Sequence, residues 1–197
     1  MANTRHTVGL RPIEQPFGNI RCNYYKAATG VEYYMYQPVD MDANGRAVLC
    51  AWNSGHPIVG SIIGILDDSF GPISNSYSGY APANPAMSGS GGFINLLVAD
   101  DPQQYFVIEE DTGGTALTAA AVGAGADYTY LATTGNTMNG IANVVLDRSG
   151  LDTLNGVHQF RLIKKWDKPD NEFGNYCKWV VRIDTHRYTA TTGGGLV

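Results

Sequence analysis

The hydrophobic and polar positions of this chain alternate over short segments, and the clearest alternation lies near the C-terminus. Cys177, Trp179, Val181 and Ile183 share one parity, and most residues between them are polar. A period of two places these four side chains on one face of a β-strand. The preceding residues, 168–175, are rich in turn formers. The pattern predicts a long, half-buried strand that begins at Tyr176 and follows an ordered turn.

Shorter apolar segments of the same kind begin at residue 31. Asn44–Gly45 is a strong tight-turn signal and predicts that residues 40–43 fold back onto 46–52. The apolar segment Ile58–Leu66 is interrupted by Gly60 and Gly64, which indicates a bend or a bulge. Further strands are predicted at residues 31–36, 93–99, 105–109, 128–131, 144–146 and 157–163.

One segment favours a helix. Residues 115–122 are rich in alanine, with Asp111 or Thr112 as a candidate N-cap and Gly123 as a stop. Strands still greatly outnumber helices, so the predicted class is all-β. We expect residues 31–197 to form a small β-barrel or sandwich of short antiparallel strands, as one body or as two lobes.

Residues 1–30 carry two prolines and no sustained periodicity, which predicts an extended N-terminal arm. Such an arm can fold onto its own body or reach a neighbouring molecule, and its composition favours the neighbour. Large apolar and aromatic side chains are the usual anchors of protein interfaces. The candidate anchors in the arm are Phe17, Ile20, Tyr24 and Tyr25.

Residues 69–92 form a long stretch that is dense in glycine, serine, proline and asparagine. A loop of this length inside a compact domain is usually functional or disordered. Because it contains Tyr77 and Tyr80, we expect an ordered contact loop with these tyrosines as further interface residues.

Composition narrows the function. Charged residues make up 16% of the chain, below the roughly 25% of an ordinary soluble domain, which leaves much neutral polar surface. The 12 tyrosines suit an interface, although a β-rich fold also uses aromatic residues as core fillers. The net charge of −5 argues against direct binding of nucleic acid, which requires a basic surface. The longest apolar segment, Ile58–Leu66, is far too short to span a membrane.

The three cysteines are Cys22, Cys50 and Cys177. Their wide spacing shows no disulfide framework and no metal-binding pair. All three have apolar or aromatic neighbours in the sequence, so we expect free, buried thiols in a reducing compartment.

No segment of the sequence carries a recognisable catalytic motif. The four histidines are far apart, and the acidic groups 67–68, 100–101 and 109–111 lack the spacing of a calcium loop. No nucleophile elbow or phosphate-binding loop is present. We therefore predict no catalytic, cofactor-binding or metal site, and a protein that is not an enzyme. A hydrolase whose catalytic residues come from distant positions is left as an alternative.

Several short strings carry a resemblance. Pro169–Gly174 reads Pro-Asp-Asn-Glu-Phe-Gly, and the following strand leads to His186 and Tyr188. Upstream lie Leu146–Gly150, the Phe160–Ile163 strand and a Val-Ala-Asp-Asp-Pro string that begins at Val98. These strings resemble the capsid cement (head decoration) proteins of tailed bacteriophages.

The resemblance implies a structural virion protein. Such a protein would bind the outer surface of a phage capsid, cement neighbouring major capsid proteins and stabilise the DNA-filled head. It implies the major capsid protein as partner, a homo-oligomer (dimer or trimer) on the capsid lattice, and a location on the capsid exterior after assembly in the host cytoplasm.

The main alternative is a carbohydrate-binding or receptor-binding β-module on a virion or cell surface. In such a module, displayed aromatic rings would stack on sugars. Trp52, Trp166 and Trp179 all fall within or beside predicted strands, so we expect them to be buried. Burial of these rings favours the capsid hypothesis.

Overall fold

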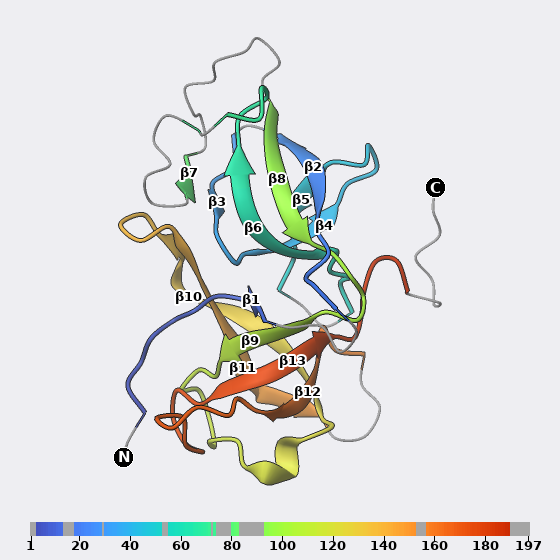
Figure 1. Ribbon diagram of the computed structural model, residues 1–197. Coiled ribbons are helices and arrows are strands. Elements are labelled where there is room, and N and C mark those ends of the chain that lie inside the picture. Colours follow the sequence, from blue (N-terminus) through green and yellow to red (C-terminus); the bar gives the residue numbers. More distant parts are fainter. Residues whose placement is uncertain are drawn as a thin grey trace.

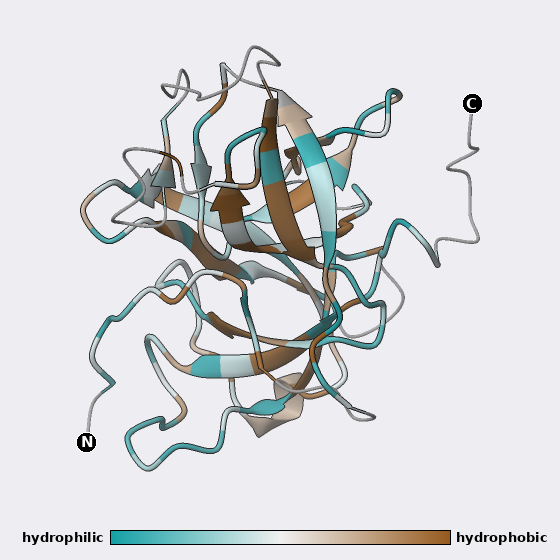
Figure 2. Cartoon of the chain, turned by 45° about the horizontal axis from the view of Figure 1, so that its top comes forward, coloured by the Kyte–Doolittle hydropathy of each residue, from teal (hydrophilic) through white to brown (hydrophobic). Residues whose placement is uncertain are grey.

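The computed structural model describes residues 3–13, 18–28, 30–52, 55–71, 73, 80–82, 93–152 and 157–189. Strands account for 49% of the chain and helix for 2%, which confirms the all-β prediction. The strands form two lobes, shown at the top and bottom of Figure 1. In Figure 2 the strands of both lobes carry long hydrophobic stretches, while hydrophilic residues gather in the connections.

The upper lobe is a closed barrel in the order β2-β5-β4-β6-β8. Its strands are β2 (Asn23–Ala28), β4 (Pro38–Met41), β5 (Ala47–Leu49), β6 (Gly60–Leu66) and β8 (Phe93–Ala99). Neighbouring strands are antiparallel except β2 and β5, which pair in parallel at Ala27 and Ala47. Beside the barrel, β3 (Tyr33–Tyr34) pairs with β7 (Tyr80–Ala81).

The lower lobe is a six-stranded sheet in the order β1-β9-β13-β12-β10-β11. Its strands are β1 (Arg11–Pro12), β9 (Tyr105–Glu109), β10 (Gly125–Asn136), β11 (Ile141–Asp152), β12 (Phe160–Lys165) and β13 (Lys178–Ile183). The sheet curls so that a parallel bridge joins Glu110, just past β9, to Leu146 of β11. Each lobe has its own cluster of buried hydrophobic side chains.

The local turn signals of the barrel are confirmed. β4 and β5 form the expected antiparallel hairpin, and Gly45 adopts a φ of 71° in its turn. The β6–β8 register shifts between Ile62 and Gly64, which is the irregularity that the glycines indicated. A Cβ atom on Gly64 would lie only 3.2 Å from that of Leu97, so the small residue permits close approach of the strands.

One prediction in the second half of the chain is wrong, and another is correct in the position of two strands but not in their length. The helix expected at 115–122 is only a three-residue 3₁₀ helix, Ala119–Ala121, whose N-cap is Thr118. Alanine favours helix, but so short a segment cannot offset the cost of helix nucleation. The expected strands 128–131 and 144–146 are parts of two 12-residue strands that form one long hairpin.

The N-terminal segment is extended, but it packs on its own chain. Leu10 is completely buried, and its N–H donates to the carbonyl of Tyr36 at 2.8 Å. The Asn3 side chain donates to the carbonyls of Glu172 and Asn175, at 2.6 and 3.0 Å. The predicted boundary at residue 30 is therefore not a structural boundary, because Asn23–Ala28 is a barrel strand. Residues 3–13 thus contact their own body, and the expectation that the arm ties the protein to neighbouring molecules stays a prediction.

Backbone pairing joins the two lobes. Met35 bridges to Ile141 and Ile58 bridges to His186, both in parallel. The N–H of Ile58 donates to Thr185 at 2.9 Å, and the N–H of Arg187 donates to Ile58 at 3.0 Å. The guanidinium of Arg187 also makes an ion pair with Asp40. These contacts tie the upper lobe to β11 and to the residues that follow β13.

The turn before β13 is held by one buried side chain. Asn171 accepts a hydrogen bond from the N–H of Lys178 and donates to the carbonyls of Trp166 and Lys178, each at 2.8 Å. All polar atoms of this amide are therefore satisfied inside the protein. The predicted ordered turn is confirmed, and Asn171 is the residue that orders it.

A buried polar network connects three strands of the lower lobe. The Trp179 indole Nε1–H donates to the Glu110 carboxylate at 2.8 Å, and Arg148 Nη1 donates to the same carboxylate at 3.2 Å. Glu110 and Trp179 are fully buried and Arg148 nearly so. Burial raises the pKa of Glu110, while the indole and the guanidinium oppose that rise.

We expect Trp179→Phe to lower the free energy of unfolding by about 1–3 kcal/mol, because the carboxylate of Glu110 loses a buried donor while the aromatic ring is largely kept. Urea unfolding measures the change. Trp166→Phe is the matched control, since Trp166 is half-buried outside this network. Equal losses in the two variants would contradict a special role for the indole N–H.

Candidate interaction surface

The residues proposed as interface anchors differ in how exposed they are. Phe17 and Tyr77 lie outside the described residues. Ile20 and Tyr24 are exposed, whereas Tyr25 and Tyr80 are half-buried. The difference between the neighbours Tyr24 and Tyr25 follows from strand geometry, because successive side chains of β2 point to opposite faces of the barrel wall.

The outer face of the barrel carries exposed aromatic side chains. Tyr24 is 54% exposed and Phe70, just after β6, is 57% exposed. Their ring centroids lie 5.2 Å apart with an interplanar angle of 83°, an edge-to-face pair. The contact fixes two large rings in place on the surface before any partner binds.

The strand register extends this surface. Tyr24 is opposite Leu97 of β8, and Leu97 is opposite Gly64 of β6. Phe93, at the start of β8, lies under the ammonium group of Lys26 at 5.8 Å from its ring centroid. We call Tyr24, Lys26, Phe70, Phe93 and Leu97 the outer barrel face. It offers mostly apolar area with a single positive charge.

Tyr25 has an internal role instead. Its hydroxyl hydrogen-bonds Asp100 and lies 2.6 Å from the hydroxyl of Tyr188, and Asn23 donates to the same carboxylate at 2.8 Å. Burial and the Asp100 contact raise the pKa of Tyr25. This cluster connects β2 with the segments that follow β8 and β13.

Tyr80 is likewise engaged within the chain. Its ring stacks on that of Tyr34, with 4.9 Å between centroids. Both hydroxyls donate to Glu32, at 3.1 Å from Tyr80 and 2.8 Å from Tyr34. These contacts fix the β3–β7 pair and leave less of Tyr80 for a partner than of Tyr24.

The expected burial of all three tryptophans is wrong. Trp179 is completely buried and Trp166 is half-buried, but Trp52 is 58% exposed. Trp52 follows Cys50 and Ala51, whose carbonyls accept hydrogen bonds from Tyr128 and Gln159. The backbone before Trp52 is thus anchored between the lobes while its indole faces solvent.

The three cysteines, like the tryptophans, differ in exposure. All three are free, but Cys22 is exposed, contrary to expectation, while Cys50 and Cys177 are buried. Cys22 directly precedes β2, and of its aromatic neighbours in sequence Tyr24 is exposed while Tyr25 packs against the barrel core. Burial raises the pKa of both Cys50 and Cys177 to about 12, so neither is a thiolate at neutral pH.

The described residues do not assemble an obvious chemical centre. In these ranges no three His, Cys, Asp or Glu side chains come together in a way that could hold a metal ion. Across the same part of the chain, no helix has the length and apolar character needed to cross a membrane. A cavity of about 490 Å³ beside Leu117 and Arg148 is lined mainly by alanine, threonine and leucine side chains.

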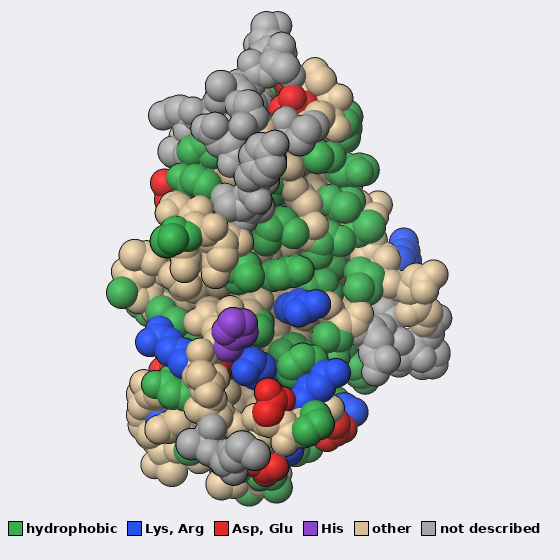
Figure 3. Space-filling view, turned by 60° about the vertical axis from the view of Figure 1, so that its left-hand side comes forward, with side chains coloured by type: hydrophobic (Ala, Val, Ile, Leu, Met, Phe, Trp, Pro, Cys, Tyr) green, Lys and Arg blue, Asp and Glu red, His purple; other side chains and the backbone are tan. Residues whose placement is uncertain are grey.

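Comparison of the chain with protein-family models, with curated protein sequences and with solved structures found no match. Its function must therefore be argued from the surfaces that the fold presents. Figure 3 shows one face of the molecule, on which hydrophobic side chains spread over the upper and middle parts and most charged side chains lie lower.

A buried histidine beside Tyr188 predicts a pH dependence. His186 is 1% exposed, and burial lowers its pKa below the ordinary value. As pH falls below about 6.5, His186 binds a proton in the unfolded chain but not in the folded chain, so folding stability is lost. Each further pH unit costs about 1.4 kcal/mol while the buried ring stays neutral.

We expect the parent to lose more stability than His186→Gln between pH 7.5 and 5.5, as measured by urea unfolding at each pH. Burial also raises the pKa of Glu109, Glu110 and Asp111, so these groups increase folding stability as pH falls, in the parent and in the variant alike. Only the difference between the two proteins therefore isolates the contribution of His186. Parallel pH profiles would show that His186 does not contribute.

Proposed function

We propose that this protein is a structural virion component that binds the outer surface of a tailed-bacteriophage capsid. It cements neighbouring major capsid proteins and so stabilises the DNA-filled head. The protein acts by binding and not as an enzyme, and it assembles on the lattice as a homo-oligomer without direct contact with nucleic acid. The motif resemblance suggests this role, and the outer barrel face supports it.

The observation that carries the proposal is the ordered aromatic pair Tyr24–Phe70. Aromatic side chains that are already fixed lose little conformational entropy when a partner covers them. They are also the residue type that dominates binding energy at interfaces. Two large rings that are more than half exposed on a barrel wall are better explained as anchors than as core residues.

The mechanism is thermodynamic. A protein that contacts two neighbouring coat subunits adds interface that must be broken before the shell can open. A stable interface buries roughly 1,200–2,000 Å² in total. Many copies on one lattice act together, so that a modest affinity of each copy gives a large combined effect. The backbone pairing between the lobes suits this role, because it resists separation of the two halves under load.

We expect Tyr24→Asp combined with Phe70→Asp to weaken capsid binding by at least about thirtyfold, which corresponds to a loss of about 2 kcal/mol from two anchors. The measurement is co-sedimentation of the purified protein with phage heads from which it has been stripped. Electron microscopy of the intact virions should first locate the protein on the outside of the head.

Val122→Asp is the matched control, because Val122 is 50% exposed but lies on the lower lobe. It should bind as the parent does, and both variants should keep the parent's melting temperature within a few degrees. Absence of the protein from the virion surface would contradict the proposal. Equal binding by the double variant would leave the capsid role standing but would remove the outer barrel face from it.

The exposed Trp52 favours a second candidate function, a carbohydrate-binding or receptor-binding module. A displayed indole on an anchored backbone is the type of surface on which sugar rings stack. This candidate rests on one ring, whereas the outer barrel face combines several apolar residues. We therefore place it second.

If the second candidate is correct, Trp52→Ala should abolish binding of the protein to a glycan array while leaving the fold intact. Trp166→Ala serves as the comparison, since its indole is half-buried. Quenching of tryptophan fluorescence by the bound sugar provides an independent readout. A parent protein that binds no glycan would exclude this reading of Trp52.

A further inference from the structure

The outer face of the lower sheet has an ordered pattern of basic and apolar residues. Across β1, β9, β13 and β12, one row of directly opposed residues runs Arg11, Val107, Val180 and Lys164. In the next row, Tyr105, Arg182 and Arg161 oppose one another. Cations thus flank an apolar centre that is formed by the two valines.

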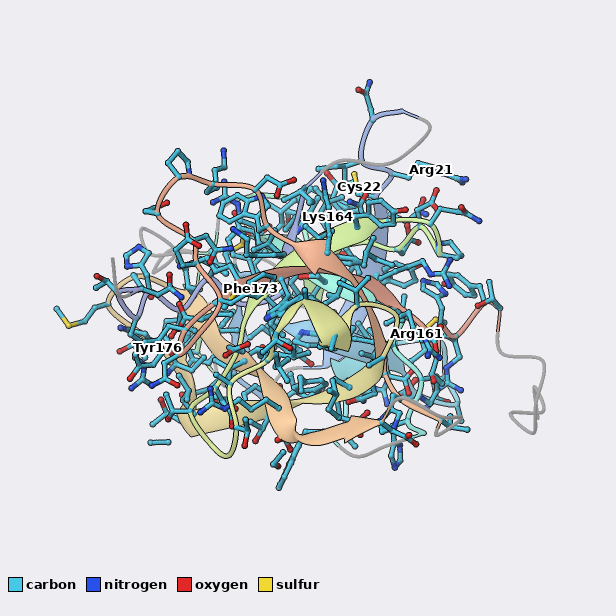
Figure 4. The ribbon with its side chains drawn as sticks, turned by 90° about the horizontal axis from the view of Figure 1, so that it is seen from below. Arg21, Cys22, Arg161, Lys164, Phe173 and Tyr176 are labelled. Carbon is cyan, nitrogen blue, oxygen red and sulfur yellow. The ribbon has the colours of Figure 1, made fainter. Side chains whose placement is uncertain are left out.

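A groove of about 370 Å³ lies over this centre. It is lined by Val180 at the sheet, by Ile13 beyond β1, and by Lys164, Trp166, Asp167 and Lys168. Val180 is 1% exposed, so it forms the floor, and the longer side chains form the walls. In Figure 4, which views the molecule from below, Lys164 and Arg161 lie away from Phe173 and Tyr176 at the left.

The charges around the groove do not cancel. Three carboxylates pair with cations on this face: Asp167 with Lys164 at 3.2 Å, Glu109 with Lys178 at 3.6 Å, and Asp184 with both Arg161 and Arg182. On the wider sheet face these three acids are outnumbered by six basic residues: Arg11, Arg161, Lys164, Lys168, Lys178 and Arg182. Among the residues that line the groove itself, Lys164 and Lys168 outnumber Asp167. The whole chain carries −5, so the face is opposite in sign to the rest of the molecule.

We infer that this groove, which we call the Trp166 groove, is a docking site for an acidic, extended peptide segment of a partner protein. An apolar side chain of the segment rests on Val180 and Ile13. Its carboxylates pair with Lys168 and with Lys164, whose side chain is 56% exposed although it contacts Asp167. Charge complementarity gives the segment its orientation, and the apolar floor gives it a register.

The chemistry of the groove favours a peptide over a nucleic acid. The ammonium group of Lys168 lies over the Trp166 ring, 5.1 Å from its centroid, so that face of the indole is not open for a base to stack on. The floor is apolar, which suits a side chain better than a phosphate. The net charge of −5 also opposes a long polyanion.

This inference does not require the proposed capsid role, because it concerns the chemistry of the partner and not its identity. If the capsid proposal holds, the acidic segment belongs to a coat protein, and the protein contacts its surroundings through both lobes. If that proposal fails, the groove still predicts an acidic protein partner.

The test uses a fluorescein-labelled peptide of alternating glutamate and valine, with fluorescence anisotropy as the readout. We expect the full-length protein to bind it, with an affinity that falls as salt is raised. Lys164→Glu combined with Lys168→Glu should weaken binding at least tenfold, and Trp166→Ala should weaken it as well. An alternating lysine and valine peptide should not bind.

Arg46→Gln is the control, because Arg46 is a basic residue of the barrel, directly before β5, that belongs to neither proposed surface; it should bind the acidic peptide nearly as the parent does. A parent that ignores the peptide, or groove variants that bind it unchanged, would overturn the inference. Tighter binding of a single-stranded DNA oligonucleotide would replace the peptide with nucleic acid. Self-association that the groove variants abolish, without peptide binding, would make a second copy the occupant.

Discussion

The lower lobe depends on a single buried carboxylate, that of Glu110. The chain leaves β9 at this residue. The N–H of Glu110 donates to the carbonyl of Cys177, just before β13, and the N–H of Asp111 donates to the carbonyl of Leu146 in the edge strand β11. A buried carboxylate is tolerable only when it is paired and hydrogen-bonded, and here Trp179 and Arg148 supply both needs. The network therefore fixes β9, β11 and β13 relative to one another, and with them the sheet on which the Trp166 groove lies.

The closed barrel and the curled sheet would be two small bodies if the junction between them were only side-chain contact. Instead, Met35 and Ile58 continue the hydrogen bonding of the lower lobe into the upper one. The N-terminal segment strengthens this union, because Leu10 is buried and bonds to Tyr36 while the next residues pair with β9. A surface on one lobe is thus held at a fixed orientation to a surface on the other.

The features predicted correctly from the sequence are those with local causes. The Asn44–Gly45 hairpin and the turn around Asn171 follow from residues that are adjacent in the chain. The burial of Leu10 could not be predicted, because the few apolar residues near it, Val8 and Ile13, do not extend into a sustained periodicity. The long hairpin was not predicted because residues 132–140, which are mostly polar or glycine, show no apolar pattern typical of a strand. In addition, residues 131–134 bulge opposite Asn143. Of the candidate anchors, Tyr24 and Tyr25 could have been separated once β2 was known to be a strand.

The scarcity of charge in this chain determines where its surfaces can act. Several of its charged residues are used inside the molecule, as in the pairs of Arg148 with Glu110 and Arg187 with Asp40. The outer barrel face is consequently almost neutral and can contribute apolar area, which gives affinity with little dependence on salt. The Trp166 groove keeps an excess of cations, which contributes orientation and rate of encounter and weakens as salt rises. The two surfaces therefore differ in physical character and are suited to different contacts on the same partner or on two neighbouring ones.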